Sequence, residues 1–195
     1  NSGALAEFIE ALNLGPVAIV GNSMGGSSCI RLAYERPDLV THLVTLGSSA
    51  GVPSIFDPVG LSEGVKALEA AYFEPGPETM RKFIATMAFD SSYVTDEFIA
   101  ERVEILNSRP EHIEGWISGH GKPMVRIDQT RLADIKAPTL LIHGRDDRTV
   151  PFTAGLHLVR NIPDARLLLV TRCGHWVQLE HTDEFNRSVA SFILG

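Results

Sequence analysis

A serine flanked by glycines gives the first indication of chemistry in this chain. The segment Gly21-Asn22-Ser23-Met24-Gly25 matches the pattern G-x-S-x-G, which places a nucleophilic serine on a sharp turn between a strand and a helix. Four apolar residues, Val17 to Val20, precede the motif and a helical pattern follows it, as the motif requires. A side chain at position 21 or 25 is expected to collide across the bend, and Gly26 fits the same crowding. We therefore predict Ser23 as a nucleophile at a helix N-terminus, where unpaired N–H groups favour negative charge.

A candidate acid and a candidate base follow along the chain. Asp146 and Asp147 come directly after an apolar strand predicted over 138–143, and His175 comes after a strand predicted over 166–171. Because parallel strands end at one edge of a sheet, Ser23, one of these acids and His175 should meet there. His175 would take the proton of Ser23, and the carboxylate would fix the tautomer of the imidazole. We favour Asp147, because Asp146 lies beside Arg145 and needs no role beyond a surface ion pair.

Other interpretations of these polar residues have less support. A histidine at a strand end, such as His143, is more often a buried core residue than a ligand, and Trp176 could serve in core packing. A metal site built from His143, Asp146, Asp147 and His175 lacks the spacing of known ligand pairs. We therefore expect no metal and no cofactor.

Composition limits the kind of protein that this chain can be. With 195 residues, 44% of them hydrophobic, it can bury one sizeable core. A net charge of −7 argues against nucleic acid or an anionic membrane as the main partner, and no apolar run approaches the ~20 residues of a membrane span. Cys29 and Cys173 are too few for a disulfide framework, so we expect both to be inert and the location to be cytoplasmic. The expected partner is a small molecule, and a homo-oligomer is possible.

The order of the predicted elements gives an α/β fold with an insertion. Strands alternate with helices over residues 1–50 and 131–195, which predicts a mostly parallel sheet in one core. Residues 51–130 show helical patterns without a convincing strand, and we interpret them as a helical cap that covers the active edge. Within the cap, helices are predicted from Pro77 to Met87 and from an N-cap at Thr95 to the break at Arg109-Pro110.

The start of the chain does not fit a complete sheet. A helix with Leu5, Phe8, Ile9 and Leu12 on one face comes first, and Val17 to Val20 is the first available strand. A strand that is apolar on both faces belongs inside a sheet, yet no upstream strand is there to pair with it. We expect a chain that lacks the N-terminal strands of its fold, with one edge of this strand unpaired.

An arginine interrupts an apolar helix face in the cap. Arg102 shares this face with Phe98, Ile99, Ile105 and Leu106. Its guanidinium could reach out to solvent or to a carboxylate of its own helix, which the pattern alone favours. Alternatively, it points into a cavity beneath the cap and binds a substrate carboxylate.

Several motifs together resemble the meta-cleavage product hydrolases, which are bacterial C–C bond hydrolases of the α/β-hydrolase fold. These motifs are Gly21-Asn22-Ser23-Met24-Gly25-Gly26, Arg109-Pro110-Glu111-His112, Gly144-Arg145-Asp146-Asp147-Arg148 with Pro151, Cys173-Gly174-His175-Trp176, and Glu180-His181 with Asp183-Glu184-Phe185-Asn186. The resemblance extends over nearly the whole chain. It implies hydrolysis of a 2-hydroxy-6-oxo-hexa-2,4-dienoate, a ring-fission product of aromatic degradation, to 2-hydroxypenta-2,4-dienoate and a carboxylic acid.

The resemblance also implies roles for single residues. Ser23, Asp147 and His175 match the catalytic triad, and His175 is implied to assist the enol-to-keto shift that makes the C–C bond cleavable. The polar subsite for the dienoate end is matched by three further residues, which are Asn22, Arg102 and Trp176. On this basis the guanidinium of Arg102 points into the cavity.

The oxyanion hole is where the sequence departs from the family. The backbone N–H of Met24 matches one donor, but the second comes from a His-Gly-rich loop after an earlier strand, whereas Gly119-His120-Gly121 lies in the cap. Because losing one such donor costs ~10²–10³ in rate, we expect the isolated chain to be weakly active or inactive. Val150 is a candidate lining of the far subsite. Two alternatives stay open: an ester or amide hydrolase with the same triad, and a non-catalytic binding module on this fold.

Overall fold

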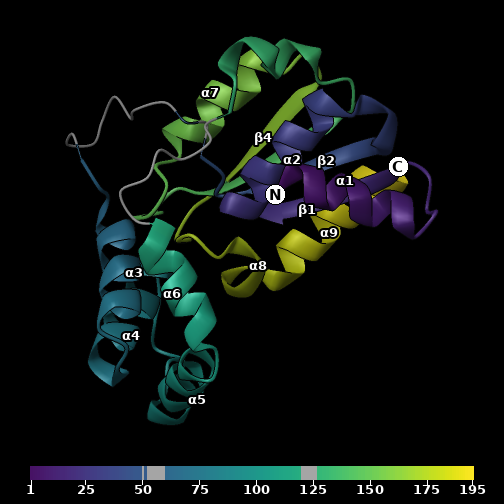
Figure 1. The fold of residues 1–195 in the computed structure, drawn as a ribbon. Coiled ribbons are helices and arrows are strands. Elements are labelled where there is room, and N and C mark those ends of the chain that lie inside the picture. Colours follow the sequence, from purple (N-terminus) through teal and green to yellow (C-terminus); the bar gives the residue numbers. More distant parts are fainter. Residues whose placement is uncertain (50, 52–59, 120–126) are drawn as a thin grey trace.

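A parallel sheet forms the centre of the structure (Figure 1). The computed structural model describes residues 1–49, 51, 60–119 and 127–195. Its strands are β1 (Val17–Asn22), β2 (Val40–Leu46), β3 (Thr139–Gly144) and β4 (Ala165–Val170), in the spatial order β1-β2-β3-β4. The register aligns Asn22 with Leu46, Leu46 with Ile142, and Gly144 with Val170. The strands therefore end together at one edge of the sheet.

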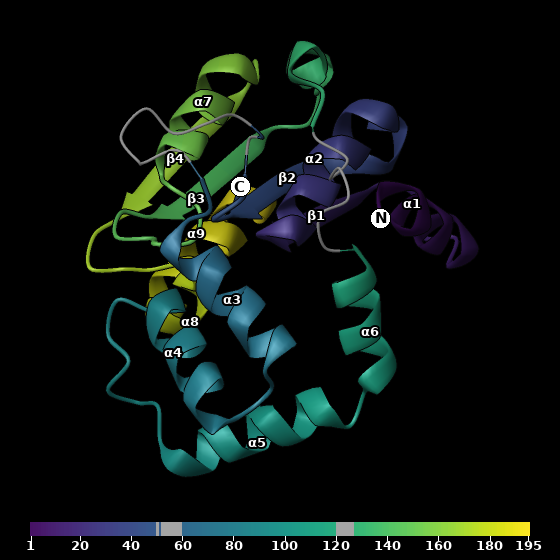
Figure 2. The same ribbon diagram turned by 60° about the vertical axis from the view of Figure 1, so that its left-hand side comes forward.

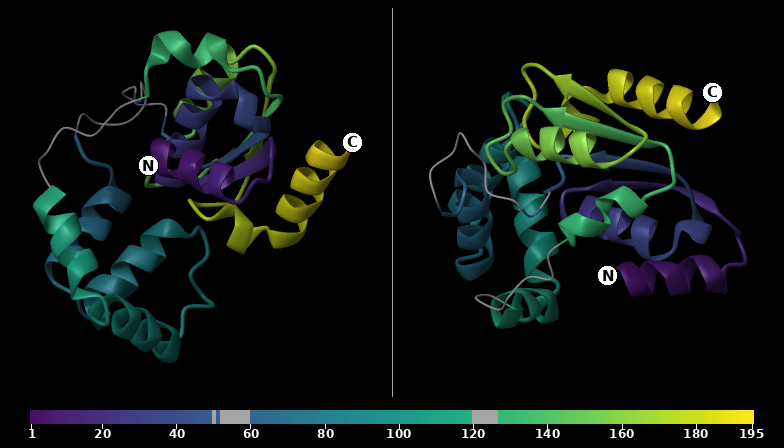
Figure 3. Two further views of the ribbon diagram at one scale, coloured as in Figure 1. Left: turned by 45° about the vertical axis from the view of Figure 1, so that its right-hand side comes forward. Right: turned by 90° about the horizontal axis from the view of Figure 1, so that it is seen from above.

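Helices cover both faces of this sheet. The helices and 3-10 turns of the α/β core are α1 (Ser2–Ala11), α2 (Met24–Glu35), η1 (Pro37–Leu39), η2 (Gln129–Asp134), α7 (Thr153–Asn161), α8 (Val177–Glu180) and α9 (Thr182–Leu194). Figure 3 shows α9 on the face opposite α1 and α2. Leu43 and Leu141 pack in the cluster that contains α1, α2 and α7, while Val44 and Ile142 pack with α9. Neighbouring residues of one strand pack on different faces because successive side chains of a strand point to opposite sides of the sheet.

Four helices occupy residues 60–119, between β2 and β3: α3 (Glu63–Phe73), α4 (Pro77–Met87), α5 (Asp96–Asn107) and α6 (Pro110–Gly119). Figure 2 shows them grouped below the sheet, with α5 farthest from it. The predicted helix from Pro77 to Met87 and the N-cap at Thr95 are confirmed, since the Thr95 hydroxyl accepts a hydrogen bond from the N–H of Phe98. A small apolar cluster holds these helices together, including Ile84 and Ile99. His120 and Gly121 lie outside the described residues.

Two sequence expectations about the first elements need correction. The first helix forms, but Phe8 and Leu12 are 60% and 51% exposed, and Ile9 is the residue of that face that is deeply buried. β1 is an outermost strand of the sheet, so among the described residues one of its sides pairs with no other strand, as expected. The apolar run predicts a strand inside a sheet, but Val20 is 45% exposed because no strand pairs with β1 on this side among the described residues.

No helix within the described ranges has the length and apolar character needed to cross a membrane.

Candidate active site

Ser23 forms the turn between β1 and α2. Its φ of 55° and ψ of −121° are values that residues other than glycine seldom adopt. The N–H of Ser23 donates to the carbonyl of Leu46 at the end of β2, at 2.8 Å, which anchors the turn to the sheet edge. Met24 is the first residue of α2, so its N–H has no acceptor within the helix.

Close packing around this turn explains two of its glycines. A Cβ at Gly21 would lie 2.6 Å from the backbone of Gly25 and Gly26, and a Cβ at Gly26 would overlap the hydroxyl of Ser48. At Gly25 a Cβ would meet nothing within 4 Å. The expected collision at position 25 is therefore wrong, whereas the crowding expected at Gly26 is confirmed, because the chain after β2 passes beside it.

A buried hydrogen bond joins the candidate base to one of the two candidate acids. His175 Nδ1 lies 2.7 Å from Asp147 Oδ2, and the two side chains are 4% and 0% exposed. Asp146 contacts Arg145 instead and accepts a hydrogen bond from the N–H of Arg172 at 2.9 Å. Of the two acids, Asp147 is thus the one that contacts His175.

The surroundings of Asp147 keep its carboxylate ionised. Oδ1 accepts hydrogen bonds from the N–H groups of Thr149 and Val150, at 2.7 and 3.0 Å, and Oδ2 lies 3.4 Å from His143 Nε2. Burial alone would raise the pKa of Asp147, but the contacts with His143 and His175 outweigh it and lower the pKa to about 2. An ionised carboxylate only accepts, so His175 Nδ1 carries a proton and, in the neutral ring, Nε2 can accept one.

The residue before Ser23 contacts the backbone of His175. The side-chain amide of Asn22 donates to the carbonyls of Leu46 and His175, at 3.1 and 3.4 Å. Gly47, the next residue after Leu46, has a φ of 50°, and a Cβ there would lie 2.9 Å from His175 Nδ1. Among the described residues no hydrogen bond joins Ser23 Oγ to His175 Nε2. Catalytic hydrogen bonds of this kind commonly tighten only when substrate binds.

The loop that carries His175 is hydrogen-bonded to the end of α4. The N–H of His175 donates to the carbonyl of Met87 at the end of α4, at 2.7 Å, and a Cβ at Gly174 would lie 2.5 Å from the same oxygen. The carboxylate of Glu180 accepts hydrogen bonds from the N–H of Gly174 at 2.8 Å and from the N–H of Phe89 at 2.6 Å. The position of His175 therefore depends on the end of α4.

The acid loop is fastened to the start of α3 in a similar way. The N–H of Gly64 donates to the carbonyl of Arg148 at 3.0 Å, and the hydroxyl of Ser62 donates to the carbonyl of Thr149 at 2.7 Å. A Cβ at Gly64 would overlap the side chain of Thr149. A glycine at this position lets the helix and the acid loop pack in contact.

A cavity of about 370 Å³ lies between the cap helices and α8. It brings together Arg102 and Trp176, two of the residues predicted for the polar subsite, within a mostly apolar lining. Arg102 is an exposed residue overall, and the central carbon of its guanidinium lies 5.0 Å from the centroid of the Phe98 ring. Among the described residues no carboxylate lies within ion-pair distance of it.

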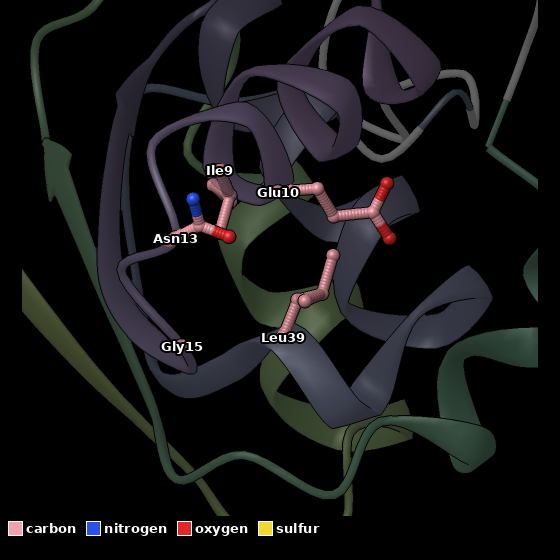
Figure 4. A pocket seen from close by; sticks show the side chains of 5 residues that line it. All are labelled: Ile9, Glu10, Asn13, Gly15 and Leu39. Carbon is pink, nitrogen blue, oxygen red and sulfur yellow. The ribbon is translucent and has the colours of Figure 1, made fainter.

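The other residues predicted to bind substrate lie outside the lining of this cavity. Met24 is 52% exposed, Val150 packs partly buried against the main core, and the amide of Asn22 is occupied by backbone carbonyls. The roles of these residues stay predictions. A separate hollow of about 340 Å³ lies near the amino ends of β1 and β2, at the opposite edge of the sheet, and contains no predicted site residue (Figure 4).

Two residues near the site were not assigned to it from the sequence. His143, expected to be a buried core residue, is 2% exposed but also lies beside Asp147, and Gly47 lies against the ring of His175. Both positions mark the carboxyl ends of strands, which is the signal that could have identified them. In the described part of the chain, no group of three or more His, Cys, Asp or Glu side chains is arranged to hold a metal ion.

Comparison with known proteins agrees with this geometry. Residues 3–182 match the alpha/beta hydrolase fold family, and the fold and the site together define an α/β hydrolase. A 2-hydroxy-6-oxononadienedioate/2-hydroxy-6-oxononatrienedioate hydrolase from Dechloromonas aromatica (strain RCB) is 41% identical over 195 residues, which cover 99% of this chain and 67% of that protein. A 2-hydroxy-6-oxo-6-phenylhexa-2,4-dienoate hydrolase from Burkholderia cepacia is 40% identical, covering 100% of this chain and 68% of that protein.

Solved structures lead to the same family. A meta-cleavage product hydrolase from Pseudomonas fluorescens IP01 (CumD) superimposes with a TM-score of 0.85 and 32% identity, covering 97% of this chain and 68% of that one. The 2-hydroxy-6-oxo-6-phenylhexa-2,4-dienoate hydrolase (BPHD) from Rhodococcus sp. strain RHA1 gives a TM-score of 0.84 and 26% identity, covering 96% and 67%. The chain belongs to the meta-cleavage product hydrolases.

Proposed function

We propose that the protein is a serine-type hydrolase that cleaves a C–C bond in 2-hydroxy-6-oxo-hexa-2,4-dienoates, the ring-fission products of aromatic degradation. By their names, the relatives above act on substrates of this class. The observation that carries the proposal is the buried 2.7 Å contact between His175 Nδ1 and Asp147 Oδ2, at the sheet edge where Ser23 makes its strained turn.

The chemistry needs a base that can also return a proton. His175 assists the shift of the 2-hydroxyl proton to C5, which gives the 2-keto form. In this form the C5–C6 bond can break because its electron pair is delocalised through C4 and C3 onto the 2-keto oxygen. Ser23 supplies or activates the oxygen nucleophile that adds to C6. His175 takes the proton of this nucleophile and returns it to the oxygen of the dienolate that leaves when the C5–C6 bond breaks. Water is consumed overall, and the products are 2-hydroxypenta-2,4-dienoate and a carboxylic acid.

Two negative charges of the reacting substrate need stabilisation, one on the oxyanion at C6 and one on the carboxylate. The N–H of Met24 and the N-terminus of α2 stabilise the oxyanion that forms on C6. Arg102 binds the carboxylate at the other end of the dienoate, in the cavity that it shares with Trp176. Both cysteines are buried and unpaired, which supports a cytoplasmic location.

The test uses the full-length protein and follows loss of the yellow dienolate absorbance with 2-hydroxy-6-oxo-6-phenylhexa-2,4-dienoate. Ser23→Ala should lower kcat by at least ~10³, whereas Ser28→Ala, in the helix that follows Ser23, should not. Arg102→Ala should raise KM roughly 10- to 100-fold, because it removes a charge-assisted hydrogen bond to the substrate carboxylate. Arg81→Ala, which removes another arginine from the same group of helices, is the control and should leave KM unchanged. Turnover that survives Ser23→Ala would exclude this nucleophile. Hydrolysis of p-nitrophenyl esters without dienoate turnover would instead identify an esterase.

A further inference from the structure

His143 has an unusual position for a core residue. It lies in β3, four residues before Asp147, and its ring is 2% exposed. Its Nε2 lies 2.8 Å from the carbonyl oxygen of Val150. A carbonyl oxygen only accepts, so Nε2 must carry a proton. The same atom lies 3.4 Å from Asp147 Oδ2, which places this N–H beside both the carbonyl and the carboxylate.

These contacts link His143, Val150 and Asp147 to one another in a closed set. Val150 accepts from His143 through its carbonyl and donates its own N–H to Asp147 Oδ1, at 3.0 Å. The N–H of Thr149 also donates to Oδ1, at 2.7 Å, and His175 occupies Oδ2. Each oxygen of the carboxylate therefore has its own set of neighbours. Rotation of the carboxylate would disturb all of them at once.

Packing alone does not require an imidazole at this position. A Cβ at Gly155 on α7 would lie 3.2 Å from His143 Nδ1, so the ring fills the space between β3 and α7, as an apolar side chain of similar size would. An apolar side chain, however, would leave the carbonyl of Val150 and the buried carboxylate without this N–H. The low pKa of Asp147, about 2 despite its burial, is consistent with a favourable contribution from His143.

We propose that His143 is a positioning residue for the reaction: by holding Val150 and Asp147, it fixes the direction in which the Asp147 carboxylate presents itself to His175. This inference rests on the proposed function, because the orientation of His175 affects turnover only if His175 is the base. It does not require His143 to touch substrate or to change its charge.

Three substitutions separate this role from packing. His143→Leu fills the space of the ring without a donor, and His143→Asn keeps a polar amide that reaches only the level of Nδ1. His143→Gln places an amide N–H at the level of Nε2. We expect the leucine and asparagine variants to lower kcat roughly 10- to 100-fold with little change in KM, and the glutamine variant to restore most of it. Leu141→Ala, in the same strand, is the packing control, because Leu141 is 2% exposed and lies in the main core cluster.

A second readout does not depend on turnover. The proton on His175 Nδ1, bonded to a carboxylate, should give a strongly deshielded resonance in the proton NMR spectrum. We expect this resonance to shift or broaden in His143→Leu and His143→Asn, and to persist in His143→Gln and Leu141→Ala. If it shifts in this pattern while turnover does not depend on Ser23, the positioning of Asp147 is supported and the proposed nucleophile is wrong.

Two results would overturn the inference. One is wild-type kcat and an unchanged resonance in both His143→Leu and His143→Asn. The other is an equal loss of kcat in the asparagine and glutamine variants. If this loss equals the loss of folded protein in each variant, as expected for Leu141→Ala, His143 is only a packing residue. If the leucine variant does not fold, the comparison of asparagine with glutamine decides the question alone.

Discussion

Replacing Asp147 with asparagine removes a charge from the site and leaves its shape. The carboxylate receives three hydrogen bonds, two from the N–H groups of Thr149 and Val150 on Oδ1 and one from His175 on Oδ2. An amide has a single acceptor oxygen. Because two backbone N–H groups converge on Oδ1 and cannot turn away, the amide oxygen should stay there. The new NH₂ group then faces His175.

This orientation forces the wrong tautomer on the base. The NH₂ group donates, so His175 must accept at Nδ1 and carry its proton on Nε2. The imidazole can then no longer take a proton from Ser23, and the imidazolium that would form has lost its carboxylate. We expect Asp147→Asn to lower kcat by ~10³–10⁴, the loss seen when the acid of a serine triad is replaced in this way, with little change in KM.

The matched control is Asp146→Asn, because the two acids are neighbours on one loop. Asp146 accepts from the N–H of Arg172, and an amide oxygen can replace its carboxylate there, so turnover should change by no more than about twofold. Both variants are assayed with the dienoate, and thermal unfolding shows whether each is folded. A folded Asp147→Asn variant within tenfold of wild-type kcat would refute the tautomer argument. A large loss in Asp146→Asn alone would move the acid to that residue.

Two further predictions concern stability and loop packing. The pKa of Asp147 is lowered from 3.8 to about 2 in the folded protein, so its contribution to the free energy of unfolding, roughly 2 kcal/mol, is present above pH 4 and lost as the pH falls through 2. Urea unfolding between pH 5 and pH 2 should therefore show a shallower pH dependence for Asp147→Asn than for wild type, and equal slopes would contradict this. Gly174→Ala should displace the His175 loop, because its Cβ would lie 2.5 Å from the carbonyl of Met87. We expect its kcat to fall at least about tenfold, whereas Gly115→Ala, in open space on α6, should retain full turnover.

The sequence predicts those parts of the fold that local signals control. The helix N-cap at Thr95, the proline at the start of α4 and the apolar run of β3 each depend on a few neighbouring residues, and each forms as expected. The strand ends also carry the candidate triad, since parallel topology alone places Ser23, Asp147 and His175 at one edge.

The expectations that fail depend on residues far apart in the chain. Gly25 has open space beside it although the turn motif predicts crowding there, because no distant segment of the described chain packs against that position. Phe8 is exposed although it continues an apolar helix face, because burial depends on what packs against the helix and not on periodicity alone. The contact between His143 and Asp147 likewise appears only once the acid loop folds back toward β3.

The four helices between β2 and β3 also contact the loops that carry the candidate base and acid. α4 supports the base directly, because the carbonyl of Met87 receives the N–H of His175, and α3 supports the acid loop through Gly64. The proposed carboxylate ligand, Arg102, stands on α5, which packs against α4 through Ile84 and Ile99. α4 therefore contacts both: its end holds the loop of the proposed base, and one of its faces packs against the helix that carries the proposed carboxylate ligand. Changes confined to α5 should then affect mainly KM, changes in the loops mainly kcat, and changes in the packing of α4 both.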